Sequence, residues 1–456
     1  MKKTKKFLGY FLIAMIFMVG LSGCTKKKVA TDPNANKLVV WGFEDEDAWK
    51  EIAEEFTSKN KGYDIVYKRQ ILNSEYEIKL LNSILSSEGP DVWEMPNDWI
   101  YRHSQKLIPL SEKDSADINL DSFLPIVKQS VFINNKIYAL TTNSQPLVIL
   151  YNEDLIEKRT DEIIDSLGQE DARDSARSLL NNFPLTWDEF TEYTKLLTKK
   201  NGANIEISGV ALGTDKVTFS NDILYLLMYQ NGTDIVSDNF ELATFNLAKE
   251  TPKVTTEFPG RRALEFYTSF SNPKSPNYTW NDSLGNNIDA FANGKVATIF
   301  AYADTENYLK QKYPAFSYNK AAVPQLYSDD PAKITDYAKF YAYGVSNQTD
   351  KPELAWALVK MISGESSSAT LNSSMGYSSS QAIKDQEPAL TERDQSNPES
   401  IELLTSRTLI KGRYPVDFDN AIKNAITEVN RGVQDSGSAL NAAANTITQL
   451  LTKNTW

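Results

Sequence analysis

Two spacings of apolar residues alternate along the chain, one typical of strands and the other of helices. Residues 37–43 and 63–67 are short apolar runs rich in β-branched and aromatic side chains, which predicts two buried strands. Between these runs, Trp49, Ile52 and Phe56 recur three and four positions apart, which predicts a helix with one apolar side. The chain is therefore predicted to open its fold with a strand, a helix and a second strand.

The same order of elements continues towards the C-terminus. Further helices are predicted at 76–85, 187–197 and 418–429, and further strands at 90–93, 147–151 and 296–300. Alternating strands and helices favour an α/β fold in which helices cover parallel sheets. No repeat of fixed period is visible in the sequence, which disfavours solenoids and propellers.

Aromatic and acidic residues follow three of the predicted strands. In an open parallel sheet, ligands bind at the carboxyl ends of the strands. The residues at these ends are Phe43 and Glu44, Asp98 and Trp99, and Tyr302 and Asp304. A sugar needs a flat apolar surface for the C–H face of its ring and planar acceptors for its hydroxyl groups. The pairing of aromatic and acidic side chains therefore points to a sugar.

The first 36 residues have the pattern of a leader followed by a tether. Four lysines precede an apolar run at 7–21, which is shorter than a typical membrane span, and small residues then lead into Cys24. The segment Leu21-Ser22-Gly23-Cys24 resembles a bacterial lipobox, in which the cysteine is lipidated and becomes the new N-terminus. We therefore predict a lipoprotein signal peptide at 1–23 and a flexible tether at 24–36 that holds the protein outside the cytoplasm. The competing interpretation is an ordinary signal peptide that ends near an unremarkable cysteine.

Composition excludes several classes of function. The formal net charge is -12, which is a poor basis for binding a phosphate backbone, so we expect no nucleic acid. The chain has one histidine, His103, and one cysteine, too few for a zinc site, and Cys24 has no partner for a disulfide. We expect no metal and no cofactor. Chemistry that needs only carboxylates, such as glycoside hydrolysis, remains open because 60 acidic residues are present.

Motifs spread over the chain carry a resemblance to a known family. They are, in chain order, Pro90-Asp91-Val92, Leu107-Ile108-Pro109-Leu110, Lys136-Ile137-Tyr138-Ala139-Leu140, Tyr151-Asn152-Glu153-Asp154-Leu155, Pro184-Leu185-Thr186-Trp187-Asp188-Glu189-Phe190, Ala290-Phe291-Ala292-Asn293-Gly294-Lys295-Val296-Ala297, Tyr343-Gly344-Val345-Ser346 and Lys351-Pro352-Glu353-Leu354-Ala355-Trp356. Taken together, the chain resembles the extracellular solute-binding proteins of bacterial ABC importers, the family that includes maltodextrin binders. It departs from that pattern in a charged insertion at 157–182 and in Lys339-Phe340-Tyr341, which replaces a glycine-rich approach to a strand.

The resemblance implies a fold of two lobes, each a mostly parallel sheet flanked by helices (the type II periplasmic-binding-protein-like fold). The chain would cross between the lobes near Ser144-Gln145, near Tyr343-Gly344 and around Asn397. The N-terminal lobe would then comprise 37–143 and 345–396, and the C-terminal lobe 144–344 and 397–456.

The resemblance also implies which residues contact the solute. They are Phe43, Glu44, Asp98 and Trp99 in the first lobe, Asn143 and Gln145 at the hinge, Trp280, Tyr302 and Asp304 in the second lobe, Tyr343 at a crossing, and Arg413 and Tyr414 before a C-terminal helix. For the aromatic residues the competing interpretation is core packing, and for Glu44 and Asp98 it is a helix cap or a solvated charge. Trp41, Trp93, Trp187 and Trp356 are interpreted as core residues.

These expectations combine into one hypothesis. The protein would be a lipid-anchored, monomeric receptor on the extracytoplasmic face of the cell membrane. It would do no chemistry, would close on a carbohydrate, an oligosaccharide by preference, and would deliver it to the permease of an ABC importer. The alternatives are a surface-anchored glycoside-active enzyme that uses paired carboxylates, and the same fold binding a polyamine, a peptide or a metal chelate.

Overall fold

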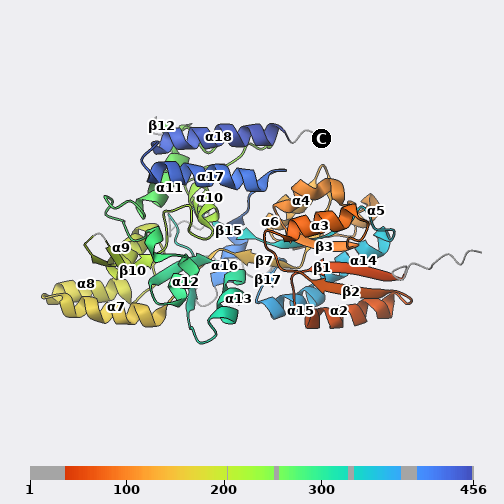
Figure 1. Cartoon of the computed structure of the whole chain (residues 1–456), viewed down its shortest axis with the longest axis horizontal. Coiled ribbons are helices and arrows are strands. Elements are labelled where there is room, and N and C mark those ends of the chain that lie inside the picture. Colours follow the sequence, from red (N-terminus) through yellow and green to blue (C-terminus); the bar gives the residue numbers. More distant parts are fainter. Residues whose placement is uncertain (1–35, 203, 251–255, 327–332, 382–397, 454–456) are drawn as a thin grey trace, which may run out of the picture. The chain divides into compact units, whose positions relative to one another are not determined.

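The structure is a computed structural model that describes residues 36–202, 204–250, 256–326, 333–381 and 398–453 (Figure 1). The predicted signal peptide, Cys24, almost all of the predicted tether and the crossing expected around Asn397 lie outside these ranges. Within them, no helix has the length and apolar content needed to cross a membrane.

A five-stranded sheet and the helices packed on it form what we call the first lobe. The strand order is β2 (Asp64–Arg69), β1 (Lys37–Gly42), β3 (Val92–Pro96), β16 (Tyr341–Val345) and β6 (Ala139–Thr141). The helices of this lobe are α2 (Glu46–Lys59), α3 (Tyr76–Leu85), α4 (Trp99–His103), α5 (Glu112–Ser115), α6 (Pro125–Val131), α14 (Pro352–Ile362) and α15 (Glu365–Met375), with 3₁₀ turns at Ser104–Lys106 and Leu120–Ser122 and a small hairpin of β4 (Phe132–Ile133) and β5 (Lys136–Ile137).

A second five-stranded sheet and its helices form the second lobe. Its strand order is β14 (Asn319–Ala321), β8 (Val148–Tyr151), β13 (Val296–Ala301), β10 (Asn204–Val210) and β9 (Lys199–Asn201). The helices are α7 (Glu153–Ser166), α8 (Glu170–Leu180), α9 (Trp187–Leu197), α10 (Ser220–Gln230), α11 (Pro259–Ser269), α12 (Asn287–Ala292), α13 (Ala303–Lys312), α17 (Pro415–Asn430) and α18 (Ser436–Thr452), with a 3₁₀ turn at Asp282–Leu284 and a short pair of β11 (Lys249–Glu250) and β12 (Thr256–Glu257).

The predicted two-lobed α/β organisation is confirmed, but the sheets are mixed where mostly parallel sheets were expected. β1 pairs with β3 and β10 pairs with β13 in parallel. β16 runs antiparallel to both of its neighbours, and β8 runs antiparallel to β13 and β14. The physical reason is the path of the chain, because β8 and β16 each enter their sheet directly from the other lobe.

Four short strands lie between the lobes along the chain and form what we call the crossing sheet. Their order is β17 (Ser378–Ser379), β7 (Asn143–Pro146), β15 (Asp336–Lys339) and β18 (Ser406–Arg407), with α16 (Pro398–Thr405) leading into the last. β7 joins β6 of the first lobe to β8 of the second, and β15 leads back into β16. The crossing expected at Tyr343-Gly344 is therefore misplaced, because these residues pair with Glu94 and Ala139 inside the first sheet.

The family-like segment at 184–190 has a local physical explanation. Thr186 is the N-cap of α9, and its hydroxyl accepts a hydrogen bond from the Glu189 backbone N–H at 3.3 Å. The Glu189 carboxylate in turn accepts from the Thr186 N–H at 3.1 Å, which completes a capping box. The motif therefore specifies a helix start, independently of any ligand.

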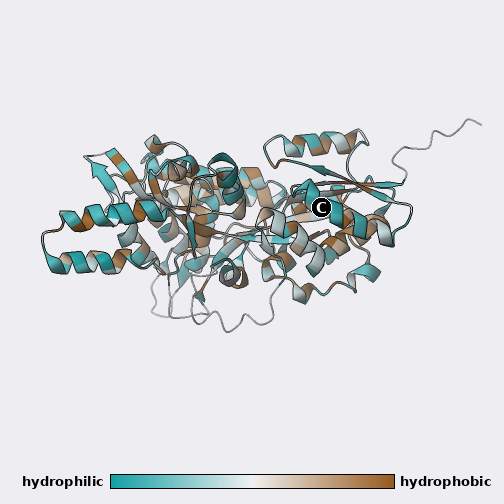
Figure 2. Cartoon of the chain, turned by 90° about the horizontal axis from the view of Figure 1, so that it is seen from below, coloured by the Kyte–Doolittle hydropathy of each residue, from teal (hydrophilic) through white to brown (hydrophobic). Residues whose placement is uncertain are grey.

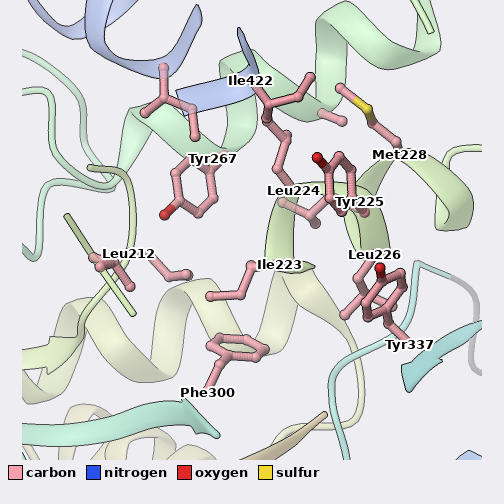
Figure 3. Close-up of a cluster of buried hydrophobic side chains, with 14 of the residues drawn as sticks. Leu212, Ile223, Leu224, Tyr225, Leu226, Met228, Tyr267, Phe300, Tyr337 and Ile422 are labelled. Carbon is pink, nitrogen blue, oxygen red and sulfur yellow. The ribbon is translucent and has the colours of Figure 1, made fainter. Parts of the chain in front are cut away.

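The apolar core of the second lobe surrounds α10. Nearly every side chain of this helix is buried, and Ile223, Leu224 and Tyr225 point towards Phe300 of β13, Tyr267 of α11 and Ile422 of α17 (Figure 3). The four tryptophans predicted to be core residues, Trp41, Trp93, Trp187 and Trp356, are all buried, and that prediction is confirmed.

The charged insertion at 157–182 is helical, as its composition predicts. It forms most of α7 and α8, which pack on each other and on α9 through Ile163, Leu180 and Leu197. Figure 2 shows this helix pair at the left edge of the view, with hydrophilic residues over most of its surface. The inward apolar residues anchor the pair to the second lobe.

We expect Gly209→Ala to destabilise the second lobe. Gly209 lies in β10 against α9, and a Cβ there would stand 1.9 Å from the Thr194 carbonyl oxygen, a contact that only a backbone shift can relieve. The free energy of unfolding, measured by urea titration, should fall by roughly 2 kcal/mol or more. The matched control is Gly168→Ala, where a Cβ would meet nothing within 4 Å and stability should stay close to the wild-type value. Equal stabilities of the two variants would contradict the packing of α9 on β10.

Candidate functional site

A buried lysine joins the two lobes. The Lys411 Nζ lies 2.8 Å from Oδ2 of Asp419 in α17 and 3.4 Å from Oδ2 of Asp98, which precedes α4 in the first lobe. Only 7% of the Lys411 side chain is exposed, against 22% for Asp98. Burial alone would lower the pKa of Lys411, but Asp419 and Asp98 outweigh burial, so the pKa is raised and the ammonium stays charged.

A second group of polar contacts surrounds Asp304 at the start of α13. Its carboxylate accepts hydrogen bonds from the hydroxyls of Tyr341 and Tyr377, the latter at 2.7 Å, and lies 3.2 Å from the Lys339 Nζ. Its backbone N–H donates to the Gln145 Oε1 at 3.4 Å. Burial would raise the pKa of Asp304, but Lys339 and the two hydroxyls together outweigh burial and hold the pKa below its usual value.

The contacts around Lys411 and those around Asp304 share one arrangement, a carboxylate that accepts a hydrogen bond from a tyrosine hydroxyl. Besides the Asp304 contacts, the Tyr302 hydroxyl donates to Asp222 at 3.0 Å and the Tyr225 hydroxyl donates to Asp419 at 2.8 Å. We call the charged residues Asp98, Asp222, Asp304, Asp419, Lys339 and Lys411 the junction network. The side chains of Asp98, Asp304 and Asp419 remain 22%, 30% and 28% exposed, so they keep acceptor positions open to a solute.

Two of the residues predicted at strand ends therefore lie at the lobe junction, each in its own group of contacts. Asp98 is the N-cap residue of α4, but its side chain makes no capping hydrogen bond and is directed to Lys411. Asp304 lies on the second-lobe side in contact with Tyr341 of the first. Trp99, next to Asp98, is half-buried and stacks on Tyr76 with ring centroids 6.1 Å apart.

The expected hinge residues lie in the crossing sheet. Asn143 and Gln145 belong to β7 and are fully buried. The Asn143 side-chain oxygen accepts a hydrogen bond from the Tyr341 backbone N–H at 3.1 Å. Both side chains thus link the strand leaving the first lobe to the segment that returns to it.

The residues expected before a C-terminal helix also lie at the junction. The Arg413 backbone carbonyl accepts a hydrogen bond from the Arg102 guanidinium of the first lobe at 2.9 Å. Tyr414 is the N-cap residue of α17 and is half-buried. Neither position contradicts the prediction of a solute contact, which stays a prediction.

Glu44 lies in the interior, although it was expected at the solute or as a cap or solvated charge. Its carboxylate is 0% exposed and accepts hydrogen bonds from the hydroxyl of Tyr343 and, at 3.4 Å, from the indole of Trp49. It shares a side-chain hydrogen bond with the equally buried Glu94. Burial raises the pKa of both carboxyls, most strongly that of Glu94.

Other predicted contacts are also interior residues in this structure. Phe43 packs edge-on against Tyr76 and Tyr341, with ring centroids 5.2 and 5.0 Å apart. Tyr343 is 0% exposed beside Glu44, and Trp280 is 1% exposed in the core of the second lobe. For these three the competing interpretation, core packing, describes the structure. Tyr302 is buried as well, but it faces the junction network through Asp222.

The single histidine is a buried residue that contacts a glutamate of the same lobe. His103 is 2% exposed at the end of α4, and its Nε2 lies 3.0 Å from the Glu77 Oε1. Burial lowers the pKa of His103, an effect that Glu77 partly opposes. Within the described ranges, no group of three or more His, Cys, Asp or Glu side chains is arranged to hold a metal ion.

Sequence reasoning missed Lys411, Asp222, Asp419 and the role of Lys339. Each is an ordinary charged residue in a chain of which 24% is charged, and none stands in a recognisable motif. The departure at 339–341 from the glycine-rich pattern was the one available signal, and it marks the segment that carries Lys339 into the junction.

Comparisons with known proteins give the chain a family context. A family model described as bacterial extracellular solute-binding protein matches residues 51–391. A maltotriose-binding protein of Pyrococcus abyssi is 22% identical over 129 residues, which cover 27% of this chain and 28% of that relative. The match therefore spans well under half of that relative's length.

Solved structures resemble the fold over nearly its whole length. A cyclic α-maltosyl-1,6-maltose-binding protein from Arthrobacter globiformis superposes with a TM-score of 0.69 at 17% identity, covering 91% of this chain and 99% of the other. A solute-binding protein from Thermotoga lettingae bound to α-D-tagatose gives a TM-score of 0.66 at 18% identity, covering 91% and 100%. At such identities the similarity establishes the fold.

We expect Glu94→Gln to flatten the dependence of stability on pH. Because burial raises the pKa of Glu94 above the ordinary carboxyl value of 4.5, the folded state should keep a proton on the pair to higher pH than the unfolded state does. The stability linked to this proton is complete below pH 4.5 and is lost as pH rises towards the folded-state pKa. Glutamine keeps the hydrogen-bond donor to Glu44 without a proton to lose. Between pH 5 and 9, the melting temperature of Glu94→Gln should therefore fall less than that of the wild type.

The matched control for this measurement is Glu88→Gln, which changes an exposed glutamate of the same lobe. Its melting temperature should follow the wild-type pH profile. A Glu94→Gln profile parallel to that of the wild type would show that the pair holds no proton in this pH range.

Proposed function

Because this chain belongs to the bacterial extracellular solute-binding protein family, we propose that it captures a carbohydrate, an oligosaccharide by preference, between its two lobes and delivers it to an ABC importer. The observation that carries the choice of solute is the junction network, where partly exposed carboxylates hydrogen-bonded to tyrosines lie between the lobes and two lysines already pair with them. The relative and structural neighbours that bind maltotriose, a cyclic maltosyl-maltose and tagatose support the same class.

The chemistry of the junction suits a neutral polyol. Carboxylates accept hydrogen bonds from sugar hydroxyls, and tyrosine hydroxyls both donate and accept. Trp99, half-buried beside Asp98, supplies an aromatic face for the C–H side of a pyranose ring. Four carboxylates against two ammonium groups disfavour an anionic solute.

Capture would work by stabilising one arrangement of the lobes. Asp98 and Arg102 come from the first lobe, while Lys411 and Arg413 follow the last strand of the crossing sheet towards α17. A solute that bonds to both sides favours the state in which these groups meet, because it gains contacts there that it lacks when the lobes are apart. No covalent step is required, and we propose a binding protein without catalysis.

We further propose how the protein is attached to the membrane, its oligomeric state and the boundaries of its lobes. Cys24 carries the lipid anchor on the extracytoplasmic face, 1–23 is removed, and 24–36 is the tether. The mature protein acts as a monomer and docks on the permease in its solute-bound state. For the lobe boundaries we propose 37–143 with 345–396 and 144–344 with 397–456, with β16 assigned to the first lobe because it pairs within the first sheet.

The test is a thermal-shift screen of residues 25–456 followed by isothermal titration calorimetry of each positive solute. A solute that binds only the folded state raises the melting temperature by mass action. We expect shifts from neutral oligosaccharides that are recovered unchanged. A shift only from polyamines, peptides or metal chelates would overturn the solute class, and conversion of the sugar would make the protein an enzyme.

We expect Trp99→Ala to weaken oligosaccharide binding at least about tenfold, the loss of an aromatic–sugar platform. The melting temperature of the free protein should change by only a few degrees because Trp99 is half-buried. The matched control is Tyr63→Ala, an exposed aromatic of the same lobe before β2, which should bind as the wild type does. A loss of folding without a separate binding defect would place Trp99 in the core.

We expect Cys24→Ser to abolish membrane attachment. The wild-type protein expressed in a bacterial host should partition into the detergent phase of a Triton X-114 extraction, because an acylated cysteine carries long hydrocarbon chains. The variant should be found in the aqueous phase or remain unprocessed. Detergent partitioning of a processed Cys24→Ser protein would refute the lipobox.

A further inference from the structure

The ammonium group of Lys339 lies among three aromatic rings. Its Nζ is 4.3 Å from the ring centre of Tyr302, 5.2 Å from that of Phe219 and 5.9 Å from that of Tyr341. The Asp304 Oδ2 lies 3.2 Å away on the same ammonium. Two of the rings come from the second lobe and Tyr341 comes from the first, so the lysine occupies a cage that both lobes build.

This arrangement is the one with which proteins bind organic cations. The negative faces of aromatic rings attract an ammonium, and a carboxylate adds its charge. The rings are held by the fold itself: Tyr302 is 0% and Tyr341 4% exposed, and Phe219 packs edge-on against Tyr302 at 4.8 Å between centroids. The cage would therefore keep its shape without the lysine.

The cage is also partly open to solvent. The side chain of Lys339 is 23% exposed and that of Asp304 is 30% exposed. A solute that reaches the junction network can therefore reach the ammonium position, which at present is filled by the protein's own side chain.

The position of Lys339 follows from strand pairing. β15 runs antiparallel to β7, and Lys339 stands opposite Gln145 in that register. Side chains opposite each other in an antiparallel pair lie on the same face of the sheet. Lys339 thus reaches the junction from β15, a strand that is paired on both sides, with β7 and with β18. The fold itself therefore holds the ammonium group at this position.

We propose that Lys339 is a tethered occupant of an organic-ammonium site and that its presence makes the junction reject small cationic solutes. Without it, the cage offers three rings and a carboxylate to a quaternary ammonium. The junction network would then lose one of its two positive charges, which strengthens the attraction for cations. The proposal stands on the cage and not on the sugar assignment.

The experiment uses choline as the probe and titration calorimetry as the readout. Wild-type protein should bind choline weakly or undetectably, and Lys339→Ala should bind it at least about tenfold more tightly, the range expected for a desolvated cation–π site. The neutral probe 3,3-dimethylbutan-1-ol has the shape of choline without its charge, and its binding should not gain. Lys339→Arg keeps a cation in the cage and should exclude choline as the wild type does.

A double variant tests the aromatic wall. Lys339→Ala with Phe219→Leu retains apolar volume but removes one ring face, and it should lose most of the choline affinity gained by Lys339→Ala. If Lys339→Ala does not fold, Lys339→Thr takes its place, since threonine is short and suits a strand.

A folded short-chain variant that binds choline no better than the wild type would overturn the proposal. An equal gain for the neutral probe would also overturn it, because it would show a vacated apolar space and no ammonium site. Sugar binding by the wild type is measured separately, so failure here and failure of the carbohydrate assignment are distinguishable.

Discussion

The register of β7 against β15 is the constraint on which the junction depends. These two strands carry the chain out of the first lobe and back into it, and they pair antiparallel with Lys339 opposite Gln145. That pairing sets where Tyr341 enters the first sheet and therefore where its hydroxyl meets Asp304. A slip of β15 by one residue would turn Lys339 to the other face of the crossing sheet, away from the face that carries Gln145.

Burying this many charges at a junction is costly unless each one has a partner. Lys411 lies between carboxylates of both lobes, and each of Asp222, Asp304 and Asp419 accepts a hydrogen bond from a tyrosine. Removing one partner of such a network leaves a buried charge unpaired, and the resulting loss of folding stability exceeds the stability that the intact pair contributes. The same network is therefore sensitive to the arrangement of the lobes, because moving the lobes apart separates Lys411 from Asp98.

The sequence predicted several of the elements and two of the residues that the structure places at the candidate site. The helices predicted at 76–85 and 187–197 coincide with α3 and α9, because their apolar spacing and the capping box at Thr186 are local signals. Asp98 and Asp304 were found because they follow strands. Glu44 follows a strand too, but its carboxyl turns inward to Glu94, 50 residues further along, and no local pattern reveals that pairing. Lys411 and Lys339 were missed for a related reason, since the contacts that bring them to the junction, with Asp98 and with Asp304, are made to residues distant in sequence.

Carboxylates and tyrosines alone do not distinguish a polyol from a cation, because both ligand classes bind to oxygen acceptors and aromatic faces. In this chain two lysines would make the difference if the proposed organic-ammonium site is correct. Lys411 neutralises part of the acidic group between Asp98 and Asp419, and Lys339 fills the ring-lined position beside Asp304. The acceptors that stay partly exposed at the junction, Asp98, Asp304 and Asp419, would then suit a neutral hydroxylated solute. Specificity at this junction would therefore be set as much by side chains that occupy space as by those that offer hydrogen bonds.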